Sequence, residues 1–174
     1  MSLSLYFGPM FSEKTSTLIK EYNKYKILDK RIVIINHVSD TRYSQSDVIS
    51  NHNRITLNAI KANQIKDINL TGFDVILIDE AQFFSDLYES TLSLIKNKKI
   101  IIIVGLDGNS NQGKFGQILD LIPYADHAVK LRALCSVCKD GTEAPFTKRT
   151  TSEKAEVLIG SSDIYQAVCR RHLN

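Results

Sequence analysis

The stretch GPMFSEKT, residues 8–15, decides the fold of this chain. It follows a short apolar segment, residues 3–7, and precedes a segment with helical periodicity. A strand, a glycine loop that carries a lysine, and a helix together form an arrangement that binds nucleoside triphosphates. The loop N–H groups and the helix N-terminus face the phosphates, Lys14 balances their charge, and the Thr15 hydroxyl can hold Mg²⁺. The stretch therefore predicts a phosphate-binding loop between a first strand and a first helix.

One position of this loop departs from the usual pattern. In G-x-x-x-x-G-K-[ST] the residue before the lysine is glycine, whereas this chain has Glu13. A side chain at this point is expected to crowd the loop, and its carboxylate is expected to repel phosphate. The alternative is that the side chain points outward and the loop keeps its shape. The loop by itself therefore suggests nucleotide binding, and the rest of the chain has to support it.

Size and charge place the chain in an ordinary class. Its length of 174 residues suits one globular domain with a small appendage, and its net charge is +3. The mild charge gives no argument for a nucleic-acid partner. No basic stretch and apolar run mark a secretory signal at the N-terminus, and no apolar run is long enough to span a bilayer. These features predict a soluble, cytoplasmic protein without a membrane partner.

Alternating apolar segments predict the architecture. Three short β-branched runs, residues 31–36, 75–79 and 100–106, are typical of strands covered on both faces of a parallel sheet. Helix-compatible segments occupy residues 15–29 and 85–96. This alternation predicts a doubly wound α/β core. After about residue 131 the segments become short and rich in turn residues, so we expect one domain over residues 1–131 and a small subdomain over residues 132–174.

A second chemical element is VILIDEAQFF, residues 75–84. A buried strand that ends in an acidic pair is the partner that a phosphate loop requires. Asp79 can hold Mg²⁺ directly or through water, and Glu80 can accept a proton from the attacking nucleophile. The alternative is a strand that ends in a solvated Asp-Glu turn. The upstream Lys-Thr pair favours the functional interpretation.

The cysteines form the third element. Cys135 and Cys138 make a CxxC pair, and Cys169 and His172 make a CxxH pair. Two such pairs supply four ligands for a tetrahedral Zn²⁺, and four protein ligands make a structural site, without an open position for chemistry. A disulfide and a redox-active CxxC are the alternatives. No export signal supports the first, and the position of the pair after the α/β core disfavours the second.

The remaining polar features are assigned ordinary roles. His37 and His127 are expected at strand ends, without a nucleophile beside them. The polar stretch of residues 40–54 is interpreted as a plain loop, with a substrate-side loop as the alternative.

These elements together resemble one family. The order of motifs is GPMFSxKT, IDEAQFF, LDG…FG, KLxALCxxC, TKR and IGxxDxYxxVCRxH. It is similar to the order in the thymidine kinases of the zinc-containing, P-loop type, a class with cellular, bacterial and large-virus members. The resemblance runs from about residue 3 to residue 172, and the acidic motif followed by the two zinc-binding pairs is highly specific. It implies a P-loop NTPase-like (RecA-like), mostly parallel α/β fold with a small C-terminal zinc-ribbon or lasso subdomain.

The resemblance also implies an activity and a site. The enzyme would transfer the γ-phosphate of ATP to the 5′-hydroxyl of thymidine to give dTMP, and it would also accept deoxyuridine. Glu80 matches the catalytic base. The residues that match the site for ATP and Mg²⁺ are Gly8, Pro9, Met10, Phe11, Ser12, Glu13, Lys14, Thr15 and Asp79. The residues that match the nucleoside site and its closing lasso are Phe83, Leu106, Phe115, Thr147, Leu158, Ile159, Gly160 and Tyr165. The implied Zn²⁺ ligands are Cys135, Cys138, Cys169 and His172. Asp40, Arg42 and Tyr43 match a DxRY loop near the active site.

Further expectations concern partners and departures from the family. The resemblance implies a role in nucleoside salvage for DNA synthesis, a homotetramer and feedback inhibition by dTTP, with no nucleic-acid partner. The chain departs from the family at Glu13, at Ser110, where vertebrate and poxvirus members have phenylalanine, and at His172, where many relatives have cysteine. Two alternatives stay open: a weakened or inactive nucleoside-binding descendant, and a P-loop ATPase that acts on nucleic acid.

Overall fold

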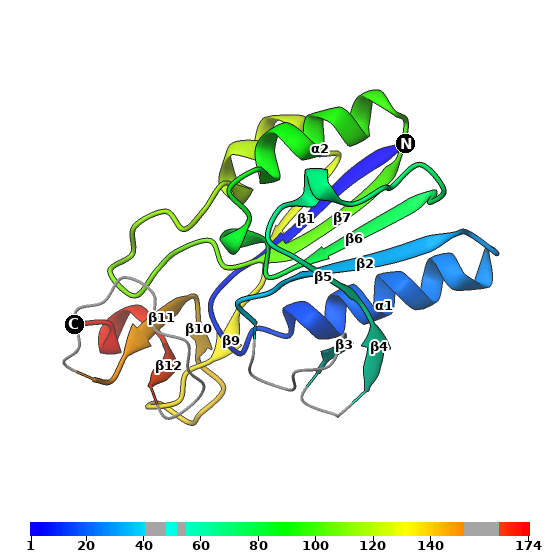
Figure 1. Cartoon of the computed structure of the whole chain (residues 1–174). Helices are drawn as coiled ribbons and strands as arrows, with labels where there is room; N and C mark the ends of the chain where they lie inside the picture. Colours follow the sequence, from blue (N-terminus) through cyan, green and yellow to red (C-terminus); the bar gives the residue numbers. More distant parts are fainter. Residues whose placement is uncertain (41–47, 52–54, 152–163) are drawn as a thin grey trace.

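A central sheet of six parallel strands organises the molecule (Figure 1). The structure is a computed structural model, and it describes residues 1–40, 48–51, 55–151 and 164–174. The strand order is β5-β2-β6-β7-β1-β8, and every neighbouring pair is parallel. The strands are β1 (Ser2–Phe7), β2 (Ile32–His37), β5 (Ile60–Ala62), β6 (Val75–Asp79), β7 (Ile100–Gly105) and β8 (His127–Lys130). The predicted parallel α/β sheet is confirmed, and the three predicted apolar runs form β2, β6 and β7.

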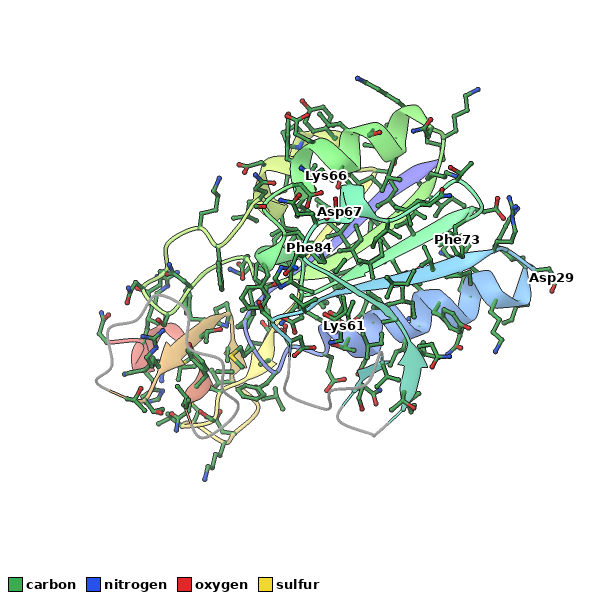
Figure 2. All side chains as sticks on the ribbon, in the orientation of Figure 1. Asp29, Lys61, Lys66, Asp67, Phe73 and Phe84 are labelled. Carbon is green, nitrogen blue, oxygen red and sulfur yellow. The ribbon has the colours of Figure 1, made fainter. Side chains whose placement is uncertain are left out.

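Two helices cover opposite faces of this sheet (Figure 1). They are α1 (Lys14–Ile27) and α2 (Leu87–Lys96). The predicted helix over residues 15–29 extends too far, because Asp29, labelled at the end of α1 in Figure 2, takes the left-handed conformation with φ 51°. The predicted helix over residues 85–96 begins too early. Asp86 lies just before α2, and its carboxylate accepts hydrogen bonds from the backbone N–H groups of Ile65 and Lys66.

Two apolar layers hold the helices to the sheet. Leu18 and Ile19 of α1 pack against β2, β6 and β7 on one face. On the other face, Leu87 and Leu94 of α2 pack with Phe84, which Figure 2 labels, and with the alternate residues of the same strands. Strands β6 and β7 are buried almost throughout because both of their faces are covered. This rigid centre fixes the positions at which the strands end.

Short elements complete the α/β core. A two-stranded hairpin, β3 (Val48–Ser50) and β4 (Thr56–Asn58), packs on the side of α1. Three 3-10 turns, η1 (Ile65–Asp67), η2 (Ala81–Phe83) and η3 (Ile118–Tyr124), lie on the side of α2. Among the described residues, no helix has the length and apolar character needed to cross a membrane.

A C-terminal module lies beyond the carboxyl ends of the central strands (Figure 1). Its described residues form two antiparallel strand pairs and a final 3-10 turn: β9 (Ala133–Leu134) with β10 (Glu143–Ala144), β11 (Phe146–Arg149) with β12 (Tyr165–Val168), and η4 (Arg170–His172). Its own buried cluster contains Ala133, Ala144, Ala167 and Val168 together with Cys135 and Cys169. Because this cluster is separate from the two layers of the sheet, we propose a boundary between residues 131 and 132.

Candidate active site and metal centre

Residues 8–13 join β1 to α1, and Lys14 and Thr15 are the first residues of this helix. The start of this loop is tightly enclosed. The Gly8 N–H donates to the Gly105 carbonyl at 3.3 Å, and a Cβ on Gly8 would lie 2.4 Å from the Leu131 carbonyl oxygen. Only glycine fits such a close approach of two backbone segments. The loop therefore starts from a fixed point at the carboxyl end of β1, where parallel α/β sheets bind their ligands.

Glu13 takes the left-handed conformation immediately before α1. Phe11 and Glu13 both take the left-handed conformation, with φ of 64° and 61°. The Glu13 side chain is exposed, and its carbonyl accepts hydrogen bonds from the Thr17 N–H and hydroxyl, both at 2.9 Å. This geometry agrees with the alternative in which the side chain points outward.

The side chains of Lys14 and Thr15 contact the loop and the end of β6. The Lys14 ammonium contacts the Pro9 carbonyl and lies 3.3 Å from the Ser12 hydroxyl, so it sits over the loop. The Thr15 hydroxyl is 3.3 Å from the Asp79 carboxylate at the end of β6. The Lys14 ammonium can bind phosphate. The pair formed by the Thr15 hydroxyl and the Asp79 carboxylate can bind a divalent cation.

The acidic pair at the end of β6 is buried. Asp79 and Glu80 are only 3% and 6% exposed, which excludes a solvated turn. The Glu80 N–H donates to the Asp79 carboxylate at 2.9 Å, and Glu80 itself is left-handed, with φ 51°. The Gln82 amide donates to the Glu80 carboxylate at 2.6 Å. These contacts fix the position of the Glu80 carboxylate at the carboxyl ends of the central strands.

Aromatic rings gather next to this pair. Phe83 lies edge-to-face with Phe115 at 5.7 Å between centroids, and 5.6 Å from the His37 ring. Burial lowers the pKa of the His37 imidazole, which favours its neutral form. Leu106 follows directly after β7, and its N–H donates to the Gln82 side chain at 2.9 Å. The structure thus brings Phe83, Phe115 and Leu106 to the same edge of the sheet as Glu80.

The C-terminal module contacts the phosphate loop directly. The Thr147 hydroxyl of β11 accepts a hydrogen bond of 3.0 Å from the Met10 N–H, and both residues are buried. Tyr165 of β12 lies across from Arg149, whose guanidinium donates to the tyrosine hydroxyl at 3.2 Å. Predicted site residues Leu158, Ile159 and Gly160, and also Arg42 and Tyr43, lie outside the described residues.

Sequence reasoning missed two buried polar residues near the acidic pair. Gln82 lies within the acidic motif and links Glu80 to Leu106. Asn36 is fully buried at the end of β2, in register with Asp79, and its amide donates to the Asp40 carboxylate at 3.0 Å. A polar residue at the end of an apolar run was the available signal for Asn36.

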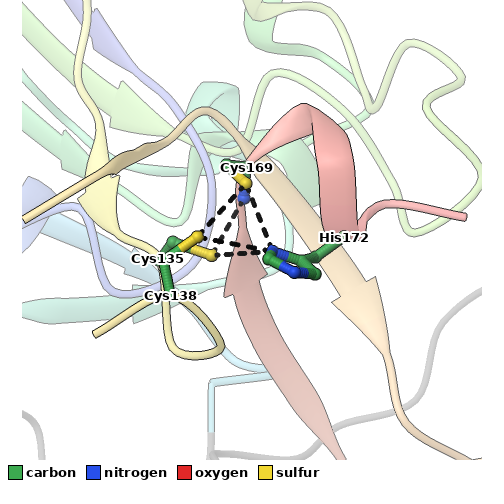
Figure 3. Close-up of side chains that lie close together, drawn as sticks. All are labelled: Cys135, Cys138, Cys169 and His172. Atoms are coloured by element: carbon green, nitrogen blue, oxygen red, sulfur yellow. Dashed lines mark hydrogen bonds between the residues drawn. The ribbon is translucent and has the colours of Figure 1, made fainter. Parts of the chain in front are cut away.

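The four predicted metal ligands form one cluster (Figure 3). The Cys138 and Cys169 sulfur atoms are 3.7 Å apart, and the three sulfur-to-Nδ1 distances to His172 are 3.4, 3.5 and 3.7 Å. A tetrahedral Zn²⁺ with bonds of about 2.3 Å to sulfur and about 2.0–2.1 Å to nitrogen requires ligand separations of about 3.8 and 3.6 Å. These four separations are close to the required values, so the cluster could hold a metal ion such as Zn²⁺.

The three thiols of this cluster are reduced, and two of them differ in their pKa. All three cysteines are free, which excludes the disulfide alternative in this structure. Burial raises the pKa of the Cys138 thiol to about 11, and the sulfur atoms of Cys135 and Cys169 contribute to the same shift. Burial also acts on the Cys135 thiol, but hydrogen bonds from the backbone N–H groups of Cys138 and Cys169 outweigh it and lower the pKa of this thiol to about 5. A divalent cation between the sulfur atoms would stabilise the thiolate form of each of them.

Comparison with known proteins decides the family. A family model described as thymidine kinase matches residues 1–173. The chain belongs to the thymidine kinase family. It is therefore a kinase, an enzyme that transfers a phosphoryl group, and the resemblance predicted from its motifs is confirmed.

Cellular and viral thymidine kinases are similar to the chain over nearly its whole length. The cytosolic thymidine kinase of Cricetulus griseus is 38% identical over 97% of this chain and 71% of its own length. The thymidine kinase of Vaccinia virus (strain Ankara) is 37% identical over 97% of this chain and 94% of its own length. The cytosolic thymidine kinase of Gallus gallus is 37% identical over 97% of this chain and 75% of its own length.

Proposed function

We propose that this enzyme transfers the γ-phosphoryl group of ATP to the 5′-hydroxyl of thymidine, and of deoxyuridine, giving dTMP and dUMP respectively, with ADP. The match of the thymidine kinase model to residues 1–173 carries this proposal. The geometry supports it, because a phosphate loop, a buried acidic pair and an aromatic cluster meet at one edge of the sheet.

Glu80 is the proposed catalytic base. The 5′-oxygen forms a bond to the γ-phosphorus while the bond from phosphorus to the β–γ bridging oxygen breaks, and the hydroxyl proton moves to the Glu80 carboxylate. Because Glu80 is held on a rigid strand end, its carboxylate needs little reorganisation.

The other residues of the site position groups and balance charge. Lys14 and the N–H groups of residues 11–15 bind the triphosphate. Phe83 packs on the thymine ring, and Leu106 and Phe115 line the rest of the nucleoside pocket. Mg²⁺ would be held by Thr15 and Asp79, and it would supply charge neutralisation of the phosphates. Thr147 and Tyr165 belong to the proposed nucleoside side of the site. The proposed metal at Cys135, Cys138, Cys169 and His172 is a structural Zn²⁺ that anchors the C-terminal module.

The resemblance supports three further proposals about the cellular context. We expect the enzyme to act in nucleoside salvage, to form a homotetramer and to be inhibited by dTTP. The relatives from Cricetulus griseus and Gallus gallus are named cytosolic, which supports a cytoplasmic location.

A turnover assay tests the proposal. Purified protein with thymidine and Mg-ATP should produce dTMP, measured by chromatography, and the Glu80→Gln variant should lose about 10²–10⁴-fold in kcat because it keeps the shape and removes the base. Glu89→Gln makes the same chemical change at an exposed position of α2 and should keep full activity. Wild-type turnover by Glu80→Gln would reject the assigned base. Absence of dTMP from wild-type protein that binds DNA or RNA would favour the nucleic-acid alternative.

A further inference from the structure

Gln82 is a buried amide that uses both ends of its side chain. It is 4% exposed and lies in η2, two residues after Glu80. Its Nε2 donates to Glu80 Oε2 at 2.6 Å, and its Oε1 accepts from the Leu106 N–H at 2.9 Å. Because the Leu106 N–H requires an acceptor and a carboxylate requires a donor, the orientation of this amide is determined by its partners. Gln82 therefore ties the end of β6 to the end of β7.

Two glycines make room for this bridge. A Cβ on Gly105 would lie 2.9 Å from Gln82 Oε1. Gly116 is left-handed, with φ 64°, and a Cβ there would lie 2.4 Å from the Gln82 backbone carbonyl oxygen. The side chain and the backbone of Gln82 are thus each enclosed by a residue without a side chain. Such close contact on both sides restricts the amide to one position.

We propose that Gln82 is a positioning residue for phosphoryl transfer, which fixes the Glu80 carboxylate and favours its ionised form. This inference rests on the proposed role of Glu80 as base. A hydrogen bond donated to a carboxylate stabilises its charged form, and the carboxylate must be charged in order to accept the 5′-hydroxyl proton. The amide neither gains nor loses a proton itself over the working pH range, so it remains a donor throughout.

The Gln82→Met variant tests this role, because methionine keeps the length of the side chain and removes both polar groups. The acidic limb of the kcat–pH profile should move upward by about one pH unit, since the ionised carboxylate loses a donor. The plateau value of kcat should fall about tenfold because the carboxylate is less well oriented. KM for thymidine and for ATP should change less than twofold. A general loss of folding would lower only the amount of active enzyme, so it would not move the acidic limb.

Two further variants make the test specific. Gln64→Met makes the same change in the loop before η1, away from the acidic pair, and should leave the profile unchanged. Gln82→Glu keeps the shape and places a second carboxylate beside Glu80, so its acidic limb should move further than that of Gln82→Met. If Gln82→Met does not fold, the kcat–pH profile of Gln82→Glu provides the test.

The outcomes separate this inference from the proposed function. If Glu80→Gln abolishes turnover and both Gln82 variants keep the wild-type profile, the positioning role is overturned and the base is retained. If Glu80→Gln keeps wild-type turnover, the proposed base itself is wrong. In the expected case, adding Gln82→Met to Glu80→Gln causes no additional loss, because the two residues act as one unit.

Discussion

Glu13 holds a backbone conformation that glycine adopts more easily. Its φ of 61° and ψ of 28° lie in the left-handed region, where a residue with a Cβ is less stable by about 1–2 kcal/mol. The chain accepts this cost because the conformation lets α1 begin at Lys14 and leaves the Glu13 side chain in solvent. An exposed carboxylate near the phosphates is screened by water and salt, so its repulsion is reduced.

We expect Glu13→Gly to bind ATP up to about tenfold more tightly, because it removes a negative charge and a strained Cβ at the phosphate loop. Thymidine affinity should not change. Calorimetry of ATP binding to the wild type, Glu13→Gly and Glu13→Gln separates the two causes, because glutamine removes only the charge. Equal ATP affinities for all three proteins would show that this departure from the usual loop is functionally silent.

At the scale of elements, the loop of residues 106–116 is held against η2 by a glycine. Gly116→Ala should destabilise the protein by about 2 kcal/mol, because the new Cβ would collide with the Gln82 carbonyl and alanine disfavours a φ of 64°. Urea unfolding measures this change. Gly72→Ala is the matched control, since a Cβ there meets nothing within 4 Å, and its free energy of unfolding should stay within about 0.5 kcal/mol. A Gly116 variant as stable as this control would contradict the packing described for the loop.

The contact between β11 and the phosphate loop is a second link between elements. Thr147→Val preserves the shape of the side chain and leaves the buried Met10 N–H without its acceptor, so we expect a loss of stability of about 1–3 kcal/mol. Thr150→Val removes an exposed hydroxyl contact to the Ile164 carbonyl on the same strand pair and should cost less than about 0.5 kcal/mol. Equal losses of stability for the two variants would show that the hydrogen bond between Met10 and Thr147 contributes no more than the exposed Thr150 contact.

At the scale of the whole molecule, the proposed metal site lies entirely within the proposed C-terminal subdomain. The four proposed ligands come from the turn after β9 and from the residues that follow β12, so a bound metal would close the C-terminal module on itself. One Zn²⁺ per chain should copurify, and its removal by a chelator should increase hydrogen exchange in β9–β12 while β6 and β7 stay protected. Exchange that rises equally in both parts would argue against the proposed boundary between residues 131 and 132.

A variant distinguishes the metal from the fold of the module. Cys169→Ser should lose Zn²⁺, measured by elemental analysis, and should raise KM for thymidine more than it lowers kcat, because the module that carries Thr147 and Tyr165 loses its anchor. Ser136→Ala, which changes a residue between two ligands without touching the sulfur atoms, should retain one Zn²⁺ per chain. Retention of the metal by Cys169→Ser would exclude this residue as a ligand.

The sequence by itself determined the architecture and the inventory of chemical groups. β-branched runs such as residues 75–79 can only be buried on two faces, so they predicted the parallel sheet and its helices. The CxxC and CxxH pairs predicted the metal cluster, because each pair brings two ligands together locally. The motif order predicted the family, and the match over residues 1–173 confirmed it.

Tertiary structure alone decided how these groups meet. The outward position of Glu13, the bond from Met10 to Thr147 and the bridge from Glu80 through Gln82 to Leu106 all depend on segments that are distant in sequence or on backbone angles that propensity does not predict. Periodicity reports which face of an element is buried, because burial repeats along the chain. A hydrogen bond between two particular atoms does not repeat, and its existence depends on the packing of the whole sheet around it.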